Sequence, residues 1–128
     1  MIFGVGVDII EVDRIEAKLR RTPGLKDKLY TPVEIGYCES KKFPAQHYAA
    51  RFAAKEAVMK ALGTGLAGGG TWQDIEVLPD AQGKPVMSLT GYFENLAREM
   101  GVQRIFVSLS HAQEYAVAQV LLWRGEQE

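Results

Sequence analysis

The sequence has 128 residues but only one cysteine, Cys38, so it cannot form an intramolecular disulfide. Small secreted domains usually depend on disulfides, and a lone cysteine therefore predicts a reducing compartment, the cytoplasm. The opening residues, Met1–Arg14, have no basic segment and contain acidic residues by Asp8 and Glu11. We therefore expect no secretory signal peptide.

The sequence also lacks long apolar runs and a large net charge. No apolar segment approaches the roughly 20 residues that cross a bilayer, so we expect no membrane-spanning helix. The formal net charge is −1, which disfavours broad electrostatic binding to nucleic acid or to a membrane surface. Hydrophobic residues make up 47% and charged residues 24%, as in globular proteins. The length predicts one domain over residues 1–128.

The standard phosphate-binding loops are missing, although the sequence is rich in glycine. The segment from Gly4 to Ile9 has no third glycine for a dinucleotide-binding fingerprint. Gly63 and Gly68 have P-loop spacing, but Gly69-Gly70 occupies the place of the required Lys-Ser/Thr pair. We interpret these glycines first as capping and loop residues, with a backbone contact to a ligand as the alternative.

What is present is an alternation of helical and strand patterns. Apolar spacing of three and four residues, a capping box from Thr31 to Glu34, and Gly63 as a C-terminal cap support helices. The predicted helices cover residues 9–21, 31–40, 44–62 and 92–100. The predicted strands cover residues 2–7 (ending at Asp8), 72–78, 85–89, 104–110 and 115–123. Two strand pairs flank short turns and predict hairpins, so we expect an α+β fold with a mainly antiparallel sheet and packed helices.

Two carboxylates are placed where chemistry could occur. Asp8 ends the first predicted strand, and Glu56 lies in the middle of the longest predicted helix. Phe52, Glu56 and Lys60 recur every fourth residue and so share one helix face. One interpretation is an ion pair between Glu56 and Lys60 within the helix. The other is a Mg²⁺ site in which Asp8 and Glu56 bind the metal and Lys60 contacts phosphate oxygens.

Two histidines and a basic stripe complete the candidates. His111 lies where an apolar strand meets a turn. It is either structural, or a general base or a hydrogen-bond donor to a phosphate. His47 shows no partner, and we predict a surface position for it. The first helix carries Arg14, Lys18 and Arg21 along one stripe, in a chain that is net acidic. The stripe is either a solvated face or a docking surface for an acidic partner.

Several ordered blocks together resemble the holo-[acyl-carrier-protein] synthase family of 4′-phosphopantetheinyl transferases. The resemblance runs from Gly4 to about Val120, and its most specific block is residues 51–57 (RFAAKEA) followed by Lys60. The other blocks are Gly6-Val7-Asp8 with Arg14-Ile15, then residues 72–77, Gly83-Lys84-Pro85, and Ser108-Leu109-Ser110-His111 before Tyr115-Ala116.

The resemblance implies the compact homotrimeric branch of the family, because the larger relatives have tryptophan where this chain has Phe52. It implies Mg²⁺ bound by Asp8 and Glu56, with Lys60 near the phosphates of the substrate coenzyme A. It implies that a neighbouring subunit contacts the nucleotide, and that the basic stripe docks acyl carrier protein. The nucleotide-contacting positions implied for this chain are Arg51, Gly63, Gly83, Lys84, Pro85 and His111.

The implied reaction moves 4′-phosphopantetheine from coenzyme A to a serine of the carrier protein, with release of 3′,5′-ADP. A metal-bound water, Asp8 or His111 could take the serine proton. Water is favoured because a cation lowers the basicity of its carboxylate ligands. Members often have a hydroxyl residue after the histidine, where this chain has Ala112. Alternatives are a Mg²⁺-dependent nucleotide or pyrophosphate hydrolase, and a non-catalytic trimeric module that binds acidic proteins.

Overall fold

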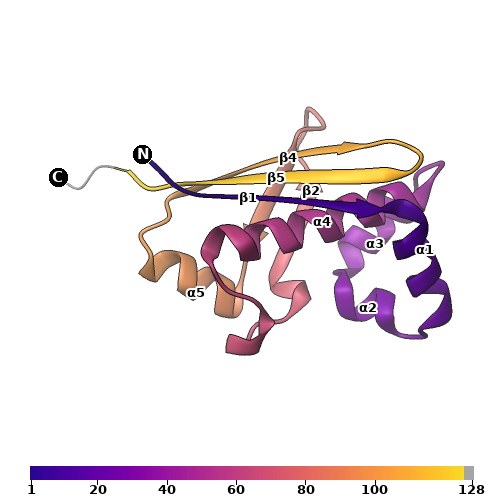
Figure 1. The fold of residues 1–128 in the computed structure, drawn as a ribbon, viewed down its shortest axis with the longest axis horizontal. Helices are drawn as coiled ribbons and strands as arrows, with labels where there is room; N and C mark the ends of the chain where they lie inside the picture. Colours follow the sequence, from indigo (N-terminus) through magenta and orange to yellow (C-terminus); the bar gives the residue numbers. More distant parts are fainter. Residues whose placement is uncertain (126–128) are drawn as a thin grey trace.

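The computed structural model describes residues 1–125 and has the predicted α+β class, with antiparallel pairing throughout its two sheets. One sheet has the strand order β1-β5-β4 and the other is the hairpin β2-β3 (Figure 1). In chain order the elements are β1 (Ile2–Glu11), α1 (Val12–Arg21), α2 (Leu25–Leu29), α3 (Pro32–Glu39), α4 (Pro44–Leu62), β2 (Ile75–Pro79), β3 (Pro85–Leu89), α5 (Gly91–Glu99), β4 (Arg104–His111) and β5 (Tyr115–Trp123).

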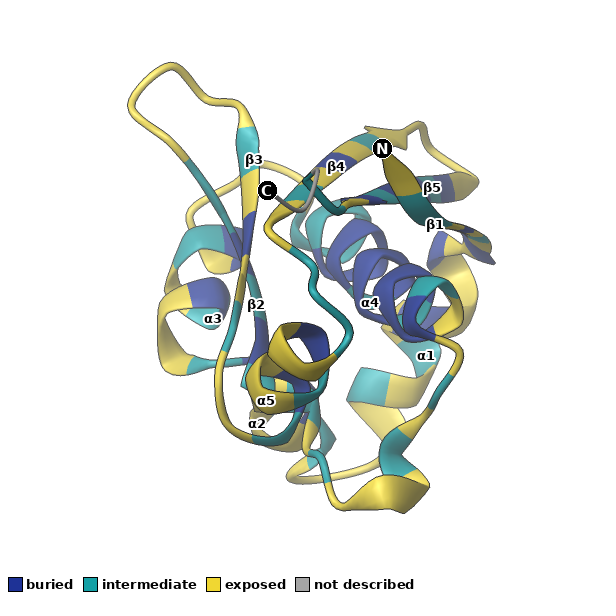
Figure 2. Ribbon diagram, turned by 90° about the vertical axis from the view of Figure 1, so that its left-hand side faces the viewer, coloured by how far each residue is buried: buried dark blue, intermediate teal, exposed yellow. Residues whose placement is uncertain are grey.

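The core lies between the three-stranded sheet and α4, which runs across its inner face (Figure 2). Small side chains let the helix sit close to the sheet: Ala53 and Ala57 of α4 are fully buried, as are Ala116 and Ala118 of β5. The bounds of α4 agree with the prediction, and Gly63 caps its end in the left-handed conformation with φ of 74°. A residue with a Cβ would be strained at that φ, so glycine is favoured there.

Gly4 and Gly6 set the distance between β1 and α4. A Cβ on Gly6 would overlap the carbonyl oxygen of Ala57, and one on Gly4 would lie 2.7 Å from the carbonyl oxygen of Ala61. The contacted atoms are backbone and cannot rotate away. These two glycines are therefore packing residues rather than the capping and loop residues we predicted, and they bring Asp8 close to the surface of α4.

The outer face of the three-stranded sheet is not covered by any element of residues 1–125 (Figure 1). Alternate residues of β1 point outward there, and Val5, Val7 and Ile9 are each more than half exposed. The same face includes Phe106, Tyr115 and Trp123, all exposed. A contiguous apolar face of this kind marks a protein interface in soluble proteins.

Two predicted boundaries are wrong. The first strand does not end at Asp8, because Ile9, Ile10 and Glu11 continue to pair with β5 out to Tyr115. The helix that we predicted from Ile9 therefore starts at Val12. Pairing with a distant strand outweighed the helical spacing of the local sequence.

The predicted strand over residues 72–78 is also partly wrong. Residues Trp72–Asp74 form a 3₁₀ turn, and the strand begins at Ile75. The turn is held by a capping box in which Asp74 accepts a hydrogen bond from the backbone N–H of Thr71. The hairpin β2-β3, the hairpin β4-β5 and α5 were all predicted, and apart from the start of β2 their ends differ by at most one residue.

A fully buried ion pair joins α3 to α4. Lys55 Nζ donates to Glu34 Oε1 at 2.7 Å and to the carbonyl of Leu29 at 2.8 Å. Glu34 also accepts a hydrogen bond from the N–H of Val77, so its carboxylate links α3 to β2. The capping box at Glu34 was predicted from sequence, but its buried partner was not. Within residues 1–125 every helix is too short or too polar to cross a bilayer.

Candidate functional site

Asp8 and Lys60 meet across the contact between β1 and α4. Lys60 Nζ donates to Asp8 Oδ1 at 2.7 Å and to the carbonyl oxygen of Val7 at 3.2 Å. The Lys60 side chain is half exposed, whereas that of Asp8 is mostly buried. One interpretation of the sequence had expected an ion pair between Lys60 and Glu56, its neighbour one turn earlier. In the structure Lys60 pairs with Asp8 instead.

Glu56 lies close enough to Asp8 for the two carboxylates to interact. Partial burial raises the pKa of Glu56, the negative charge of Asp8 raises it further, and Lys60 offsets part of this effect. Two carboxylates that repel each other form an unfavourable arrangement in the absence of a cation. The structure therefore brings together Asp8, Glu56 and Lys60, as the Mg²⁺ interpretation of the sequence required.

The donor set at this position consists of carboxylate oxygens, which suit a hard divalent cation. Among residues 1–125, no three or more His, Cys, Asp or Glu residues are arranged to hold a metal. A closed site made only of protein ligands is thus not formed there. Mg²⁺ commonly takes one or two carboxylates and completes its shell with water and substrate phosphates, so Asp8 and Glu56 fit this ion.

A second group of predicted residues lines a different cavity, of about 170 Å³, between α3, α4, β3 and β4. Arg51, Gly83, Pro85 and His111 all line it. Arg51 is almost fully buried, and its Nε donates to the carbonyl of Val77 at 3.0 Å. Its guanidinium group lies 4.3 Å from the ring centre of Tyr37, a stacked position that holds the cation at the cavity wall.

The cavity also contains two residues that we did not predict as site residues, Tyr37 and His47. The predicted surface position of His47 is wrong, because its ring is half-buried and lies 4.7 Å from the ring of His111 and 5.8 Å from that of Tyr37. The only possible signal in the sequence was the position of His47 one turn before Arg51 on α4.

Two predicted residues lie outside this cavity. Lys84 is exposed in the turn of the β2-β3 hairpin, which projects from the body of the protein (Figure 2). Asp80 Oδ1 accepts a hydrogen bond from the backbone N–H of Lys84, and this bond fixes the turn. Gly63 caps the end of α4, where its backbone N–H donates to the carbonyl oxygen of Lys60.

The two groups do not meet within one chain. Asp8 pairs with Ala118 of β5, and His111 pairs with Ala116 on the other side of the same strand. Two strand spacings therefore separate Asp8 from His111, which is roughly 10 Å. The carboxylates open at the β1 edge of the sheet, and the cavity with His111 opens at the β4 edge.

The basic stripe lies on an exposed face of α1. Arg14, Lys18 and Arg21 are all exposed, and none of them forms an ion pair within residues 1–125. Val12 and Ile15 of the same helix are buried and fix its orientation against the core. The stripe is therefore available to an acidic partner.

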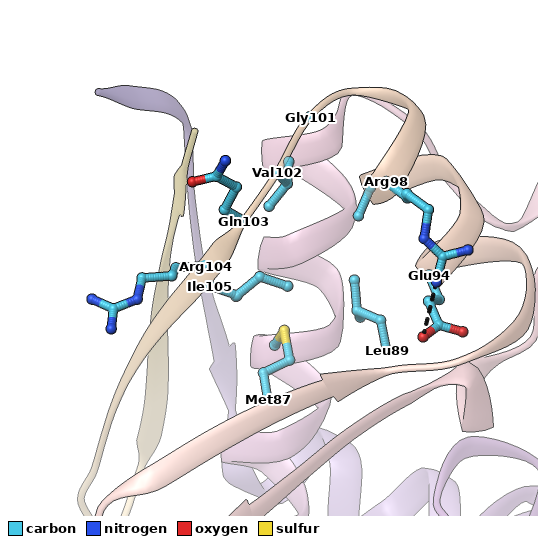
Figure 3. Close-up of a pocket in the computed structure, with 10 residues that line it drawn as sticks. Met87, Leu89, Glu94, Arg98, Gly101, Val102, Gln103, Arg104 and Ile105 are labelled. Atoms are coloured by element: carbon cyan, nitrogen blue, oxygen red, sulfur yellow. Dashed lines mark ion pairs between the residues drawn. The ribbon is translucent and has the colours of Figure 1, made fainter. Parts of the chain in front are cut away.

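A larger groove, of about 480 Å³, lies between β3, α5 and β4 (Figure 3). Met87, Leu89 and Ile105 form its floor, and an ion pair of 3.6 Å between Glu94 and Arg98 lies on its rim. None of the predicted site residues lines this groove. Size alone therefore does not locate the chemistry of this protein.

Comparison with known proteins gives a consistent result. A model of the 4′-phosphopantetheinyl transferase superfamily matches residues 4–120. A holo-[acyl-carrier-protein] synthase of Geobacter sp. (strain M21) is 52% identical over 125 residues, which are 97% of this chain and 100% of the relative. The synthase of Moorella thermoacetica is 50% identical over 117 residues, 91% of each chain.

Solved structures show the same fold. The holo-[acyl-carrier-protein] synthase of Neisseria meningitidis superposes with a TM-score of 0.88 at 31% identity, covering 97% of this chain and 100% of that chain. The synthase of Bacillus anthracis, in complex with CoA (3′,5′-ADP), superposes with a TM-score of 0.80 at 36% identity. That match covers 98% of this chain and 99% of the other.

Proposed function

Because this chain belongs to the 4′-phosphopantetheinyl transferase superfamily, we propose that it is a holo-[acyl-carrier-protein] synthase. It transfers 4′-phosphopantetheine from coenzyme A to a serine of apo acyl carrier protein and releases 3′,5′-ADP. One observation in the structure carries the proposal: β1 and α4 place Asp8, Glu56 and Lys60 together at the edge of the sheet. The relatives that match over nearly the whole chain bear this enzyme name.

Asp8 and Glu56 would hold Mg²⁺, which neutralises charge on phosphate oxygens when it is bound. Lys60 has a role that follows from its present contact. Its half-exposed ammonium group is paired with Asp8, and it can turn toward a phosphate once the carboxylate has another partner. The displacement itself needs little covalent chemistry from the protein, so positioning and charge stabilisation are the main contributions of these residues.

Arg51, Gly83, Lys84, Pro85 and His111 would bind the nucleotide half of coenzyme A. Because the cavity beside Arg51 and His111 and the carboxylates open at opposite edges of the sheet, we propose that one complete site is shared by two copies of the chain. The uncovered apolar face, with Val5, Val7 and Ile9, supports assembly of this kind. We propose a homotrimer, the arrangement implied by the family resemblance.

The exposed stripe of Arg14, Lys18 and Arg21 would bind the acidic surface of the carrier protein. The lone cysteine, Cys38, is buried, and burial raises the pKa of its thiol to about 12. A thiol of this kind is inert, and a structure without disulfides fits the cytoplasm, where we propose that the enzyme acts.

The direct test is intact-mass spectrometry of an apo acyl carrier protein incubated with this protein, coenzyme A and Mg²⁺. The expected result is a gain of one phosphopantetheine group, which a chelator abolishes. A carrier that stays unmodified here but is modified by an established transferase would overturn the proposal. Release of nucleotide from coenzyme A without a carrier would instead support the Mg²⁺-dependent hydrolase.

A further inference from the structure

The cavity beside Arg51 contains basic groups without a balancing acid. The rings of His47 and His111 lie 4.7 Å apart, and both line the cavity together with Arg51. The charged groups that act on the two rings are Arg51, Lys41 and the histidines themselves, and within residues 1–125 all of them are basic. Arg51 makes its hydrogen bonds with the backbone carbonyls of Val77 and His47. A cavity lined by one permanent cation, two imidazoles and no acid suits an anion as its ligand.

Both histidines are neutral near pH 7 before a ligand arrives. Burial lowers the pKa of His47 to about 4, and the positive charges of His111, Arg51 and Lys41 contribute to the shift. Burial also lowers the pKa of His111, with Arg51 as the second cause. An anion in the cavity beside both rings would oppose these effects, since it stabilises the protonated form of each ring.

The orientation of His111 shows which nitrogen is free to contact a ligand. Its Nδ1 lies 2.8 Å from Oε1 of Gln46. Because an amide oxygen only accepts hydrogen bonds, Nδ1 carries the proton, and in the neutral ring Nε2 holds a lone pair. Nε2 can donate a hydrogen bond to an anion only after the ring takes up a further proton.

We propose that His47 is a specificity-determining residue which, together with His111, binds the phosphomonoester group of coenzyme A and takes up a proton in doing so. This proposal rests on the proposed function, and goes beyond it in assigning His47 and the coupling to protons. Coenzyme A has a single phosphomonoester, its 3′-phosphate, and the phosphates of its pyrophosphate bridge carry only one charge each. A phosphomonoester carries between one and a half and two negative charges near pH 7, which suits a pair of imidazoles that can gain charge.

The size of the cavity agrees with this ligand. A buried cavity of about 150 Å³ admits a benzene molecule. The cavity of about 170 Å³ lined by His47 and His111 is therefore large enough for a phosphate group. Its partial exposure at His111 leaves an opening through which the remainder of the nucleotide can extend.

The sign of the pH dependence follows from linkage. The complex binds more protons than the free protein and free ligand together, so affinity falls as pH rises from about pH 6 to about pH 8. The limit for one proton is about a tenfold loss of affinity per pH unit. 3′-Dephospho-coenzyme A lacks the monoester, and its affinity should change much less over the same range.

Isothermal titration calorimetry of the wild-type protein with these two ligands tests the proposal. Titrations in two buffers of different ionisation enthalpy measure the protons taken up with each ligand. We expect uptake with coenzyme A to exceed that with 3′-dephospho-coenzyme A. The variant His47→Gln should lose much of this excess and much of the preference for coenzyme A. The variant Lys42→Gln is the matched control, since it removes a nearby exposed positive charge that acts on neither ring, and it should keep both properties.

The outcomes separate this proposal from the proposed function. Failure of coenzyme A to bind the wild-type protein would count against the transferase itself. Binding of coenzyme A with the same proton uptake as 3′-dephospho-coenzyme A would overturn only the role of the histidines. If His47→Gln keeps the full excess of proton uptake with coenzyme A over 3′-dephospho-coenzyme A, the proton belongs to another group. That result would overturn the role of His47. Thermal unfolding of both variants checks that they are folded.

Discussion

The ammonium group of Lys60 donates a hydrogen bond of 2.7 Å to the carboxylate of Asp8, which belongs to a strand 52 positions earlier in the chain. This contact exists because Gly4 and Gly6 allow α4 to approach the backbone of β1 closely. It also leaves Glu56, one turn away from Lys60, as the carboxylate whose charge is poorly compensated. The following predictions start from this arrangement.

Replacement of Glu56 by glutamine separates function from stability. The variant should lose most of its transferase turnover, because a near-isosteric amide lacks the charge that a metal ligand needs. It should also unfold at a higher temperature than the metal-free wild type at pH 7. The raised pKa of Glu56 means that the folded state loses stability as pH rises past the ordinary carboxyl range. The difference in unfolding temperature should vanish in acid, where the wild-type carboxyl group is protonated.

The variant Gly6→Ala should be strongly destabilised and inactive. Its new methyl group would overlap the backbone carbonyl of Ala57, and overpacking of this kind costs about 1–3 kcal/mol or more. Gly36→Ala is the control, because Gly36 lies within α3 with open space around its Cα. That control should gain up to about 1 kcal/mol from improved helix propensity. Urea unfolding measures both, and equal effects would refute the role of Gly6 in packing.

Removal of one partner of the buried ion pair between Lys55 and Glu34 should lower the free energy of unfolding. Lys55→Met leaves the carboxylate of Glu34 buried without its cation and should cost about 3–5 kcal/mol of unfolding free energy. The double variant Lys55→Met/Glu34→Gln should recover part of this loss, since it removes the uncompensated charge. A double-mutant cycle by chemical denaturation measures the coupling. Additive losses would show that the two groups do not stabilise each other.

The outer face of the sheet should be an assembly surface. Val7→Glu places a charge in the middle of this face and should convert the protein to monomers, as seen by analytical ultracentrifugation. Transferase activity should fall with it if two copies share a site. Val33→Glu is the matched control, because Val33 is exposed to a similar degree on α3. A monomeric wild-type protein, or a Val7→Glu variant that assembles normally, would contradict this prediction.

The basic stripe on α1 should act on the carrier protein and not on coenzyme A. Arg14→Glu should raise KM for the carrier by about tenfold or more, with little change in KM for coenzyme A. The effect should shrink at high salt, since the interaction is electrostatic. Arg98→Glu on α5 reverses a similarly exposed charge far from α1 and should leave the carrier KM unchanged (Figure 1). Equal effects of both variants would point to net charge rather than docking.

Much of the local structure follows from the sequence alone. The capping box at Thr31, the alanine-rich pattern of α4 and the glycine at position 63 each determine helix ends through local sterics and hydrogen bonds. The antiparallel hairpins follow from β-prone segments joined by short turns. The recurrence of Glu56 and Lys60 on one helix face is likewise a matter of helical geometry, because residues four apart lie one above the other.

Only the tertiary structure decided which distant groups meet. The extension of β1 to Glu11 depends on pairing with β5, and no local pattern encodes that partner. Three contacts join segments far apart in the chain: Lys60 with Asp8, Lys55 with Glu34, and His47 with His111. In the first of them Lys60 pairs with Asp8 and not with its helix neighbour Glu56. Such contacts depend on how closely two elements pack, and for Asp8 and Lys60 that distance is set by the close approach of Gly4 and Gly6 to the backbone of α4.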